Sequence, residues 1–166
     1  MVTAGGAGKY VSGRAFIVRV QSMSRKDKGT FTAKHPPGVV LDENTAVHLR
    51  KEIKGGGIPC AAAFKVAKRL GITPKEVGIA IDLLEVPIIF CQLGLFGYGE
   101  GKKKVKAAEH VPAAVADAIR KSLVEGKLPC NVAWDLARAH ALSRLDIAAA
   151  CEALGFKLSR CQIGSF

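Results

Sequence analysis

The chain has 166 residues, enough for one ordinary domain or two small ones. Hydrophobic residues make up 49% of the sequence but aromatic residues only 6%, a mix that favours small, closely packed helices over a large β-sandwich. The formal net charge of +11 favours a polyanionic partner such as nucleic acid. Charge alone predicts only non-specific attraction, so a generally basic protein is the alternative.

Residues 1–40 are expected to form an N-terminal strand followed by a basic arm. Apolar and β-branched residues predict the strand over residues 14–21. The arm carries Arg25, Lys26 and Lys28, which we expect to contact phosphates. The first ten residues lack the apolar core of a signal peptide. We therefore expect a cytoplasmic protein, nucleoid-associated if it binds DNA, with reduced cysteines.

From residue 44 onward the sequence repeats itself. Residues 44–96 align without a gap on residues 114–166, at a constant offset of 70. Two copies of one fold are therefore expected, in domains of residues 41–106 and 111–166. The identical pairs are Ala46/Ala116, Arg50/Arg120, Lys51/Lys121, Gly56/Gly126, Pro59/Pro129, Cys60/Cys130, Ala63/Ala133, Ala67/Ala137, Ala80/Ala150, Leu84/Leu154, Cys91/Cys161, Gln92/Gln162, Gly94/Gly164 and Phe96/Phe166.

Each copy is predicted to begin with two helices. Residues 44–54 place Ala46, Leu49 and Ile53 at the i, i+3, i+7 spacing of an amphipathic helix. A short extended piece then precedes Pro59, and the second helix is expected over residues 60–70. The same pattern in the second copy predicts helices after residue 114 and over residues 130–140.

A tight turn leads into a third helix in each copy. Thr73 and Ser143 are suitable N-caps, and the acidic residue three positions later completes a capping box in each case. The third helix is expected to bury Val77, Ala80, Ile81 and Leu84 or their counterparts. A strand-like segment follows, over residues 86–93 and 156–163.

This order of elements resembles the winged helix-turn-helix superfamily. The resemblance is carried by Ala67, Gly71-Ile72-Thr73, Val77 and Ile81 and by their copies. It implies a mainly α fold with short β-strands: two tandem winged-helix-like repeats plus the basic N-terminal strand and arm. It also implies a wing hairpin from residues 88–94 and 102–106. The second copy ends without a second wing strand, so residues 14–21 are expected to supply that pairing.

The resemblance and the charge together predict nucleic-acid binding, to DNA first, in a regulatory or architectural role. The third helices lack the Asn, Gln and Arg residues that read base edges, so binding is expected to depend on phosphates. The alternative is a protein-interaction or assembly module. The residues expected to bind nucleic acid are Arg25, Lys26, Lys28, Lys75, Lys102, Lys103, Lys104, Lys106 and Arg144.

The cysteines allow three interpretations. Cys60 and Cys130 open the second helices, where thiol pKa values tend to fall, and Cys91 and Cys161 lie on the following strands. If the two copies face each other, these four thiolates are candidate ligands of zinc or an iron–sulfur cluster. Core packing and redox-active thiols are the alternatives; Cys151 replaces Ile81 and is expected in the core. No cofactor is expected beyond this possibility.

The repeated segment at the end of each copy and the distribution of polar residues predict three further features. The repeated Cys-Gln-(Leu/Ile)-Gly-x-Phe segment is interpreted as a strand end, or else as a shared groove for a ligand or partner. No acid pair or nucleophile–base motif is present, so no enzymatic activity is expected. No membrane helix is expected either, because Asp82, Glu85 and Pro87 interrupt the apolar run over residues 77–99.

Overall fold

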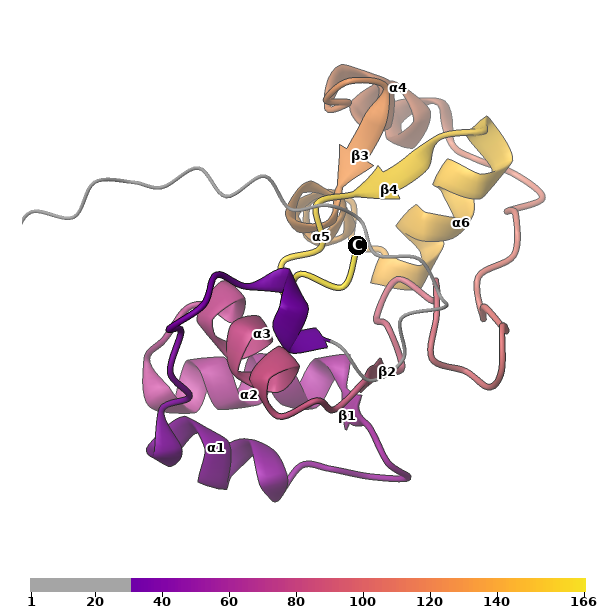
Figure 1. Cartoon of the computed structure of the whole chain (residues 1–166). Helices are drawn as coiled ribbons and strands as arrows, with labels where there is room; N and C mark the ends of the chain where they lie inside the picture. The colour runs from indigo at the N-terminus through magenta and orange to yellow at the C-terminus, as the bar shows by residue number, and fades with distance from the viewer. Residues whose placement is uncertain (1–30) are drawn as a thin grey trace, which may run out of the picture.

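The computed structural model describes residues 31–166, and the predicted strand and arm of the N-terminal region lie outside this range. A short 3₁₀ helix, η1 (Phe31–Lys34), precedes two copies of the same order of elements. The fold is mainly helical with a few short strands, as the sequence predicted. Figure 1 shows the two copies as separate lobes, with the C-terminal segment between them. The first copy contains α1 (Glu43–Arg50), β1 (Ile58–Pro59), α2 (Cys60–Leu70), α3 (Pro74–Leu83) and β2 (Ile88–Ile89), and the second contains α4 (Ala113–Lys121), β3 (Lys127–Pro129), α5 (Cys130–Ala139), α6 (Arg144–Leu154) and β4 (Lys157–Ser159).

Local side-chain chemistry sets the ends of the helices. Both predicted capping boxes are formed, by Thr73 with Glu76 and by Ser143 with Asp146. Helix α2 ends at Gly71 in the left-handed conformation, with φ of 67°. The corresponding residue after α5 is Ala141, which adopts φ of 52° although its Cβ disfavours that region. Within residues 31–166, every helix is too short or too polar to cross a membrane.

The strands pair in parallel within each copy. Ile58 lies opposite Ile88, and Leu128 lies opposite Leu158. The predicted wing hairpin is wrong: residues 102–106 form no strand, and among residues 31–166 the strand that pairs with β2 is β1. After Gly94 the chain first turns back to the end of β2, where the Phe90 N–H donates to the Gly97 carbonyl at 3.3 Å. Residues 102–106 then lie against the second copy, with Val105 buried in its core.

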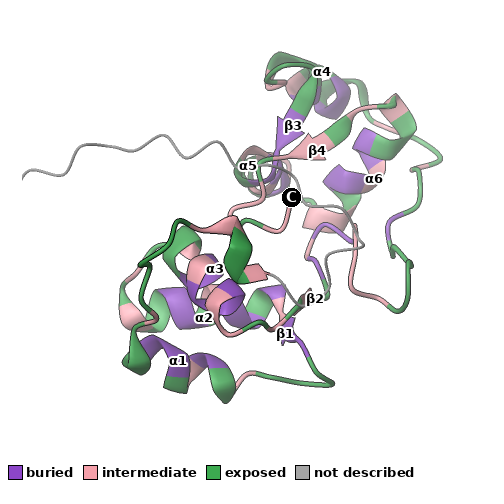
Figure 2. Ribbon diagram, viewed as in Figure 1, coloured by how far each residue is buried: buried purple, intermediate pink, exposed green. Residues whose placement is uncertain are grey.

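Each copy contributes its C-terminal loop to the hydrophobic core of the other copy. We define residues 91–96 as the first terminal loop and residues 161–166 as the second. Leu93 of the first loop, 1% exposed, packs with the core of α4–α6, whereas Ile163 of the second, 2% exposed, packs with the core of α1–α3. Figure 2 shows the buried faces of the helices turned inward in both lobes. Burying one such side chain contributes about 1.5–3 kcal/mol, so each copy depends on the other for part of its core.

Backbone contacts hold each terminal loop against the other copy. A Cβ on Gly78 of α3 would stand 2.8 Å from the carbonyl carbon of Ile163, so only glycine permits this approach. A Cβ on Gly94 would stand 2.6 Å from Leu145 Cδ1 of α6. Real Cβ atoms do not approach other heavy atoms so closely, so these two glycines explain part of the tight apposition of loop and helix.

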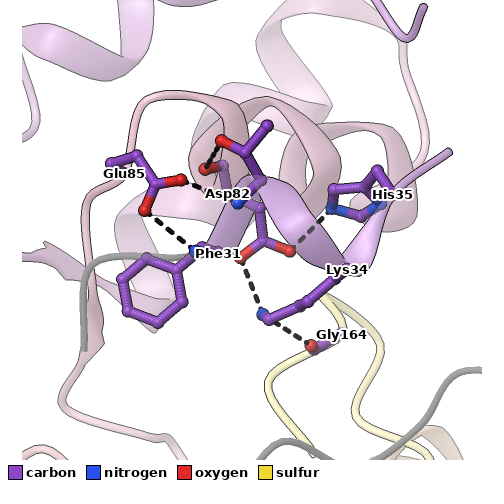
Figure 3. A network of polar contacts seen from close by, with 7 residues as sticks. Phe31, Lys34, His35, Asp82, Glu85 and Gly164 are labelled. Carbon is purple, nitrogen blue, oxygen red and sulfur yellow. Dashed lines mark hydrogen bonds and ion pairs between the residues drawn. The ribbon is translucent and has the colours of Figure 1, made fainter. Parts of the chain in front are cut away.

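The segment before each copy covers the outer face of its third helix. Figure 3 shows η1 on α3: Lys34 Nζ lies 2.8 Å from Asp82 Oδ1, and His35 Nε2 lies 2.9 Å from Asp82 Oδ2. Glu85 accepts hydrogen bonds of 2.8 Å from the backbone N–H groups of Phe31 and Thr32. These contacts fix the segment before α1 across α3.

The second copy repeats this arrangement. Lys103 Nζ lies 2.6 Å from Glu152 of α6, at the position that corresponds to Asp82. The Ala108 N–H donates to the Ala149 carbonyl at 3.0 Å. The segment before each copy, which we call its leading segment, also contacts the terminal loop of the other copy. Lys34 Nζ lies 3.5 Å from the Gly164 carbonyl oxygen, and the Lys104 N–H donates to the Gly94 carbonyl at 2.8 Å. Both third helices are therefore partly covered on their outer sides.

Candidate thiol cluster at the junction of the two copies

A small cavity lies where the two copies meet, and we call it the junction cavity. Its volume is about 10 Å³, close to the space that one water molecule needs. The lining residues form six pairs, each related by the repeat offset of 70. They are Cys60/Cys130, Phe64/Trp134, Cys91/Cys161, Gln92/Gln162, Leu93/Ile163 and Phe96/Phe166. The cavity therefore lies where equivalent surfaces of the two copies meet.

The parallel strand pairs bring the two cysteines of each copy together. Pro59 lies opposite Ile89, so Cys60 follows one strand while Cys91 comes two residues after the other. Parallel strands end at the same edge of a sheet, which places both thiols there. Cys130 and Cys161 occupy the corresponding positions beyond Pro129 and Ser159. All four cysteines line the junction cavity. The sequence left open whether the two copies face each other or stand apart, and in the structure both contribute equally to this cavity.

Aromatic contacts between the copies surround the thiols. The ring centroids of Phe64 and Trp134 lie 4.4 Å apart, and those of Phe96 and Phe166 lie 6.1 Å apart in an edge-to-face arrangement. Aromatic pairs of this kind contribute about 0.5–1.5 kcal/mol beyond the area that they bury. They join α2 to α5 and one terminal loop to the other, and so close the cavity on two sides.

Glutamine amides contact two of the four thiols. Gln92 Nε2 lies 3.6 Å from Cys60 Sγ, and Gln162 Nε2 lies 3.6 Å from Cys130 Sγ. This contact gives the repeated Cys-Gln sequence a structural role. The repeated segment is thus more than a strand end, because all of its identical side chains line the junction cavity.

Arg144 makes the two halves of the cluster unequal. Its guanidinium donates to Gln92 Oε1 and stacks on Trp134, with Cζ 3.4 Å from the ring centroid. The corresponding residue of the first copy is Pro74, which has no charge to offer to Gln162. A positive group therefore lies beside the Cys60 half of the cluster, connected to the thiol through the Gln92 amide.

Burial, and not position on the helix, dominates the ionisation of these thiols. It raises the pKa of Cys60, of Cys91 and, to about 11, of Cys130. The expectation of lowered pKa values at the starts of α2 and α5 is therefore wrong, because desolvation outweighs the effect of the helix N-terminus. Cys91 and Cys161 also raise the pKa values of both Cys60 and Cys130, so the four thiols are electrostatically coupled.

The four cysteines share one cavity without forming a ready-made metal centre. Within residues 31–166, no three His, Cys, Asp or Glu side chains are arranged to hold a metal ion. Zinc and iron–sulfur sites of the expected kind use four ligands, and the cysteines do not present that set. Cys151 lies elsewhere, 1% exposed in the core of the second copy, as predicted.

The residues expected to bind nucleic acid are spread over several elements. Lys75 is exposed at the start of α3, and Lys102, Lys104 and Lys106 are exposed on the chain between the copies. Lys103 is paired with Glu152, and Arg144 is partly buried against Trp134 and Gln92. Arg25, Lys26 and Lys28 lie outside the described residues.

Sequence reasoning missed the roles of Gln92, Gln162, Phe64 and Trp134 in the junction. The available signal was their repetition, since Gln92 and Gln162 are identical and Phe64 and Trp134 are similar. A glutamine in particular has no reason to recur in an apolar core.

Comparison of the chain with protein-family models, curated proteins and solved structures finds no match.

Proposed function

We propose that this chain binds nucleic acid, with DNA favoured over RNA, through contacts to the phosphate backbone. We also propose that its two copies are divergent winged-helix-type modules. The observation that carries the proposal is the excess of exposed cations. Of the net charge of +11, residues 31–166 contribute +6, from 19 Lys and Arg residues against 13 Asp and Glu residues. Cations distributed in this way attract a polyanion without specifying its sequence.

The first copy offers basic groups beside its helical turn. Lys65, Lys68 and Arg69 are exposed on α2, and Lys75 is exposed at the start of α3. The second copy has Asp135, Ala139 and Leu145 in place of the first, third and fourth of these cations. The first copy is therefore the better candidate for phosphate contacts through its helical turn.

The second copy offers a different feature, an open depression of about 500 Å³ beside the turn between α5 and α6. Arg138, Ser143 and Arg144 contribute to its lining. Arginine groups near the start of a helix suit a phosphate, because the helix N-terminus carries a partial positive charge. The coverage of α3 and α6 by the leading segments favours such edge contacts over insertion of these helices into a groove.

The test is the salt dependence of binding to duplex DNA. Each phosphate contact contributes about 0.9 to the slope of log affinity against log salt concentration. Replacing Lys102, Lys104 and Lys106 together with Gln should therefore lower the slope by up to about 3 and weaken binding equally for unrelated sequences. The matched control replaces Lys121, Lys127 and Lys157, three exposed lysines of the second copy, with Gln.

Two outcomes would contradict the proposal. One is an affinity that stays flat between low and moderate salt, or no measurable affinity for DNA or RNA. The other is an equal loss of affinity in the control variant, which would contradict the assignment of phosphate contacts to the lysines between the copies. A protein-interaction or assembly role is the second candidate, favoured by the covered third helices; stable co-purification of one defined protein without nucleic acid would support it.

A further inference from the structure

The junction cavity has the size and surroundings of a site for a single soft ion. Its volume of about 10 Å³ is at the lower limit for a water molecule, and a water needs two to four polar partners. Besides the two glutamine amides, four thiols, four aromatic rings and the aliphatic side chains of Leu93 and Ile163 form the lining. Sulfur ligands in an apolar, closed environment select soft metal ions over magnesium or calcium.

The arrangement of the thiols restricts the number of ligands. No three metal-binding side chains in residues 31–166 have the spacing of a ligand set, so the described residues show no preformed tetrahedral centre. A monovalent ion with a filled d shell, such as Cu(I), is satisfied by two thiolates in a linear arrangement. Cys60 and Cys130 are each held by a glutamine amide at 3.6 Å. Cys91 and Cys161 are the remaining pair, one from each terminal loop.

The charge of such a complex is compatible with its surroundings. Two thiolates and one Cu(I) ion carry a net charge of −1, which an apolar cavity disfavours unless a positive group lies nearby. Arg144 contacts Gln92 and Trp134, which line the cavity, and lies on the side of Cys60 and Cys130. The indole Nε1–H of Trp134 is buried and has no hydrogen-bond partner among the described residues. This wall of the junction cavity therefore also carries an unpaired hydrogen-bond donor.

We propose that the junction cavity binds one Cu(I) ion between Cys91 Sγ and Cys161 Sγ, and thereby connects the two terminal loops. Binding replaces both thiol protons: two thiols and one Cu(I) ion give one dithiolate complex and release two protons to solvent. No change of oxidation state is involved. Each loop completes the core of the opposite copy, so the ion also stabilises the junction. This proposal does not depend on nucleic-acid binding.

The test is an anaerobic titration of the reduced full chain with Cu(I) in the presence of a competing Cu(I) chelator. One equivalent should bind, with an ultraviolet thiolate-to-copper band and a raised melting temperature. Cys91→Ala and Cys161→Ala should each lower the affinity by more than about 100-fold, beyond the 10–100-fold cost of losing a group that only supports a ligand. Arg144→Gln should lower it by about 10-fold.

The matched control is Cys151→Ala, which removes a buried cysteine outside the cavity and should leave the affinity unchanged. Circular dichroism establishes that each variant is folded, and Cys91→Ser and Cys161→Ser replace any alanine variant that unfolds. Equal affinity in wild type and in the folded Cys91 and Cys161 variants would overturn the proposal. So would a preference for Zn²⁺ that requires all four cysteines, because it would assign a tetrathiolate site.

Discussion

Ile163→Ala tests the exchange of terminal loops through its effect on stability. Ile163 belongs to the second copy by sequence, yet it is 2% exposed and packs in the core of α1–α3. Truncating a buried isoleucine to alanine costs about 2–5 kcal/mol, from lost transfer free energy and the cavity that remains. The total free energy of unfolding of a small protein is about 5–15 kcal/mol, so the loss should be large.

The assay is denaturant unfolding followed by far-UV circular dichroism and by the fluorescence of Trp134, the single tryptophan. Trp134 contacts Phe64 of the first copy, so both probes should report one transition that moves to lower denaturant in the variant. Val124→Ala, at a residue 36% exposed, is the matched control and should cost well under the Ile163 value. A loss below about 0.5 kcal/mol for Ile163→Ala, within the range of surface substitutions, would show that Ile163 does not complete the core of the first copy.

Three further predictions follow from individual residues. Ala141→Gly should stabilise the protein by about 1 kcal/mol, because Ala141 adopts a left-handed φ of 52°, and unchanged or lower stability in thermal unfolding would contradict this. The wild type should be more stable than Glu85→Gln at neutral pH, and this difference should vanish in acid. Hydrogen bonds from Thr32 and Phe31 lower the pKa of the Glu85 carboxyl in the folded protein. The carboxylate therefore contributes its full stability above its ordinary pKa and loses this contribution as the pH falls through the lowered pKa. Unfolding midpoints measured from pH 7 to pH 3 check this, and a constant difference would contradict it. Alkylation of native Cys130 should accelerate about tenfold per pH unit from pH 7 to 10, because burial raises its pKa to about 11 and only the thiolate reacts. Mass spectrometry of the modified cysteine measures the rate, and a rate that levels off above about pH 9 would show an unshifted thiol.

The parts of the fold that the sequence predicted are those governed by local chemistry. Helix α2 begins at Cys60 and ends at Leu70 as expected, because Pro59 precedes it and Gly71 ends it. Both capping boxes formed because their donors and acceptors lie three residues apart. The facing cysteines were foreseen as one alternative, since repetition indicated that both copies place them alike.

The parts that could not be predicted depend on contacts between distant residues. Leu93 and Ile163 are apolar at equivalent positions, a pattern that specifies burial but not which core receives them. The wing was expected from a basic run after a glycine-rich turn, yet burial of Val105 directs that segment onto the second copy. The pKa of Cys60 likewise depends on burial, which raises it, more than on the position of Cys60 at the start of α2.

Hydrogen exchange in a chain lacking residues 161–166 measures whether the second terminal loop completes the core of the first copy. We expect α3 to lose protection, because Ile163 packs on Gly78 and completes that core. Amides of α6 should lose less, since Leu93 and Val105 still complete the core of the second copy. Loss of protection confined to α4–α6, with α3 unchanged, would contradict the exchange of terminal loops and the junction built on it.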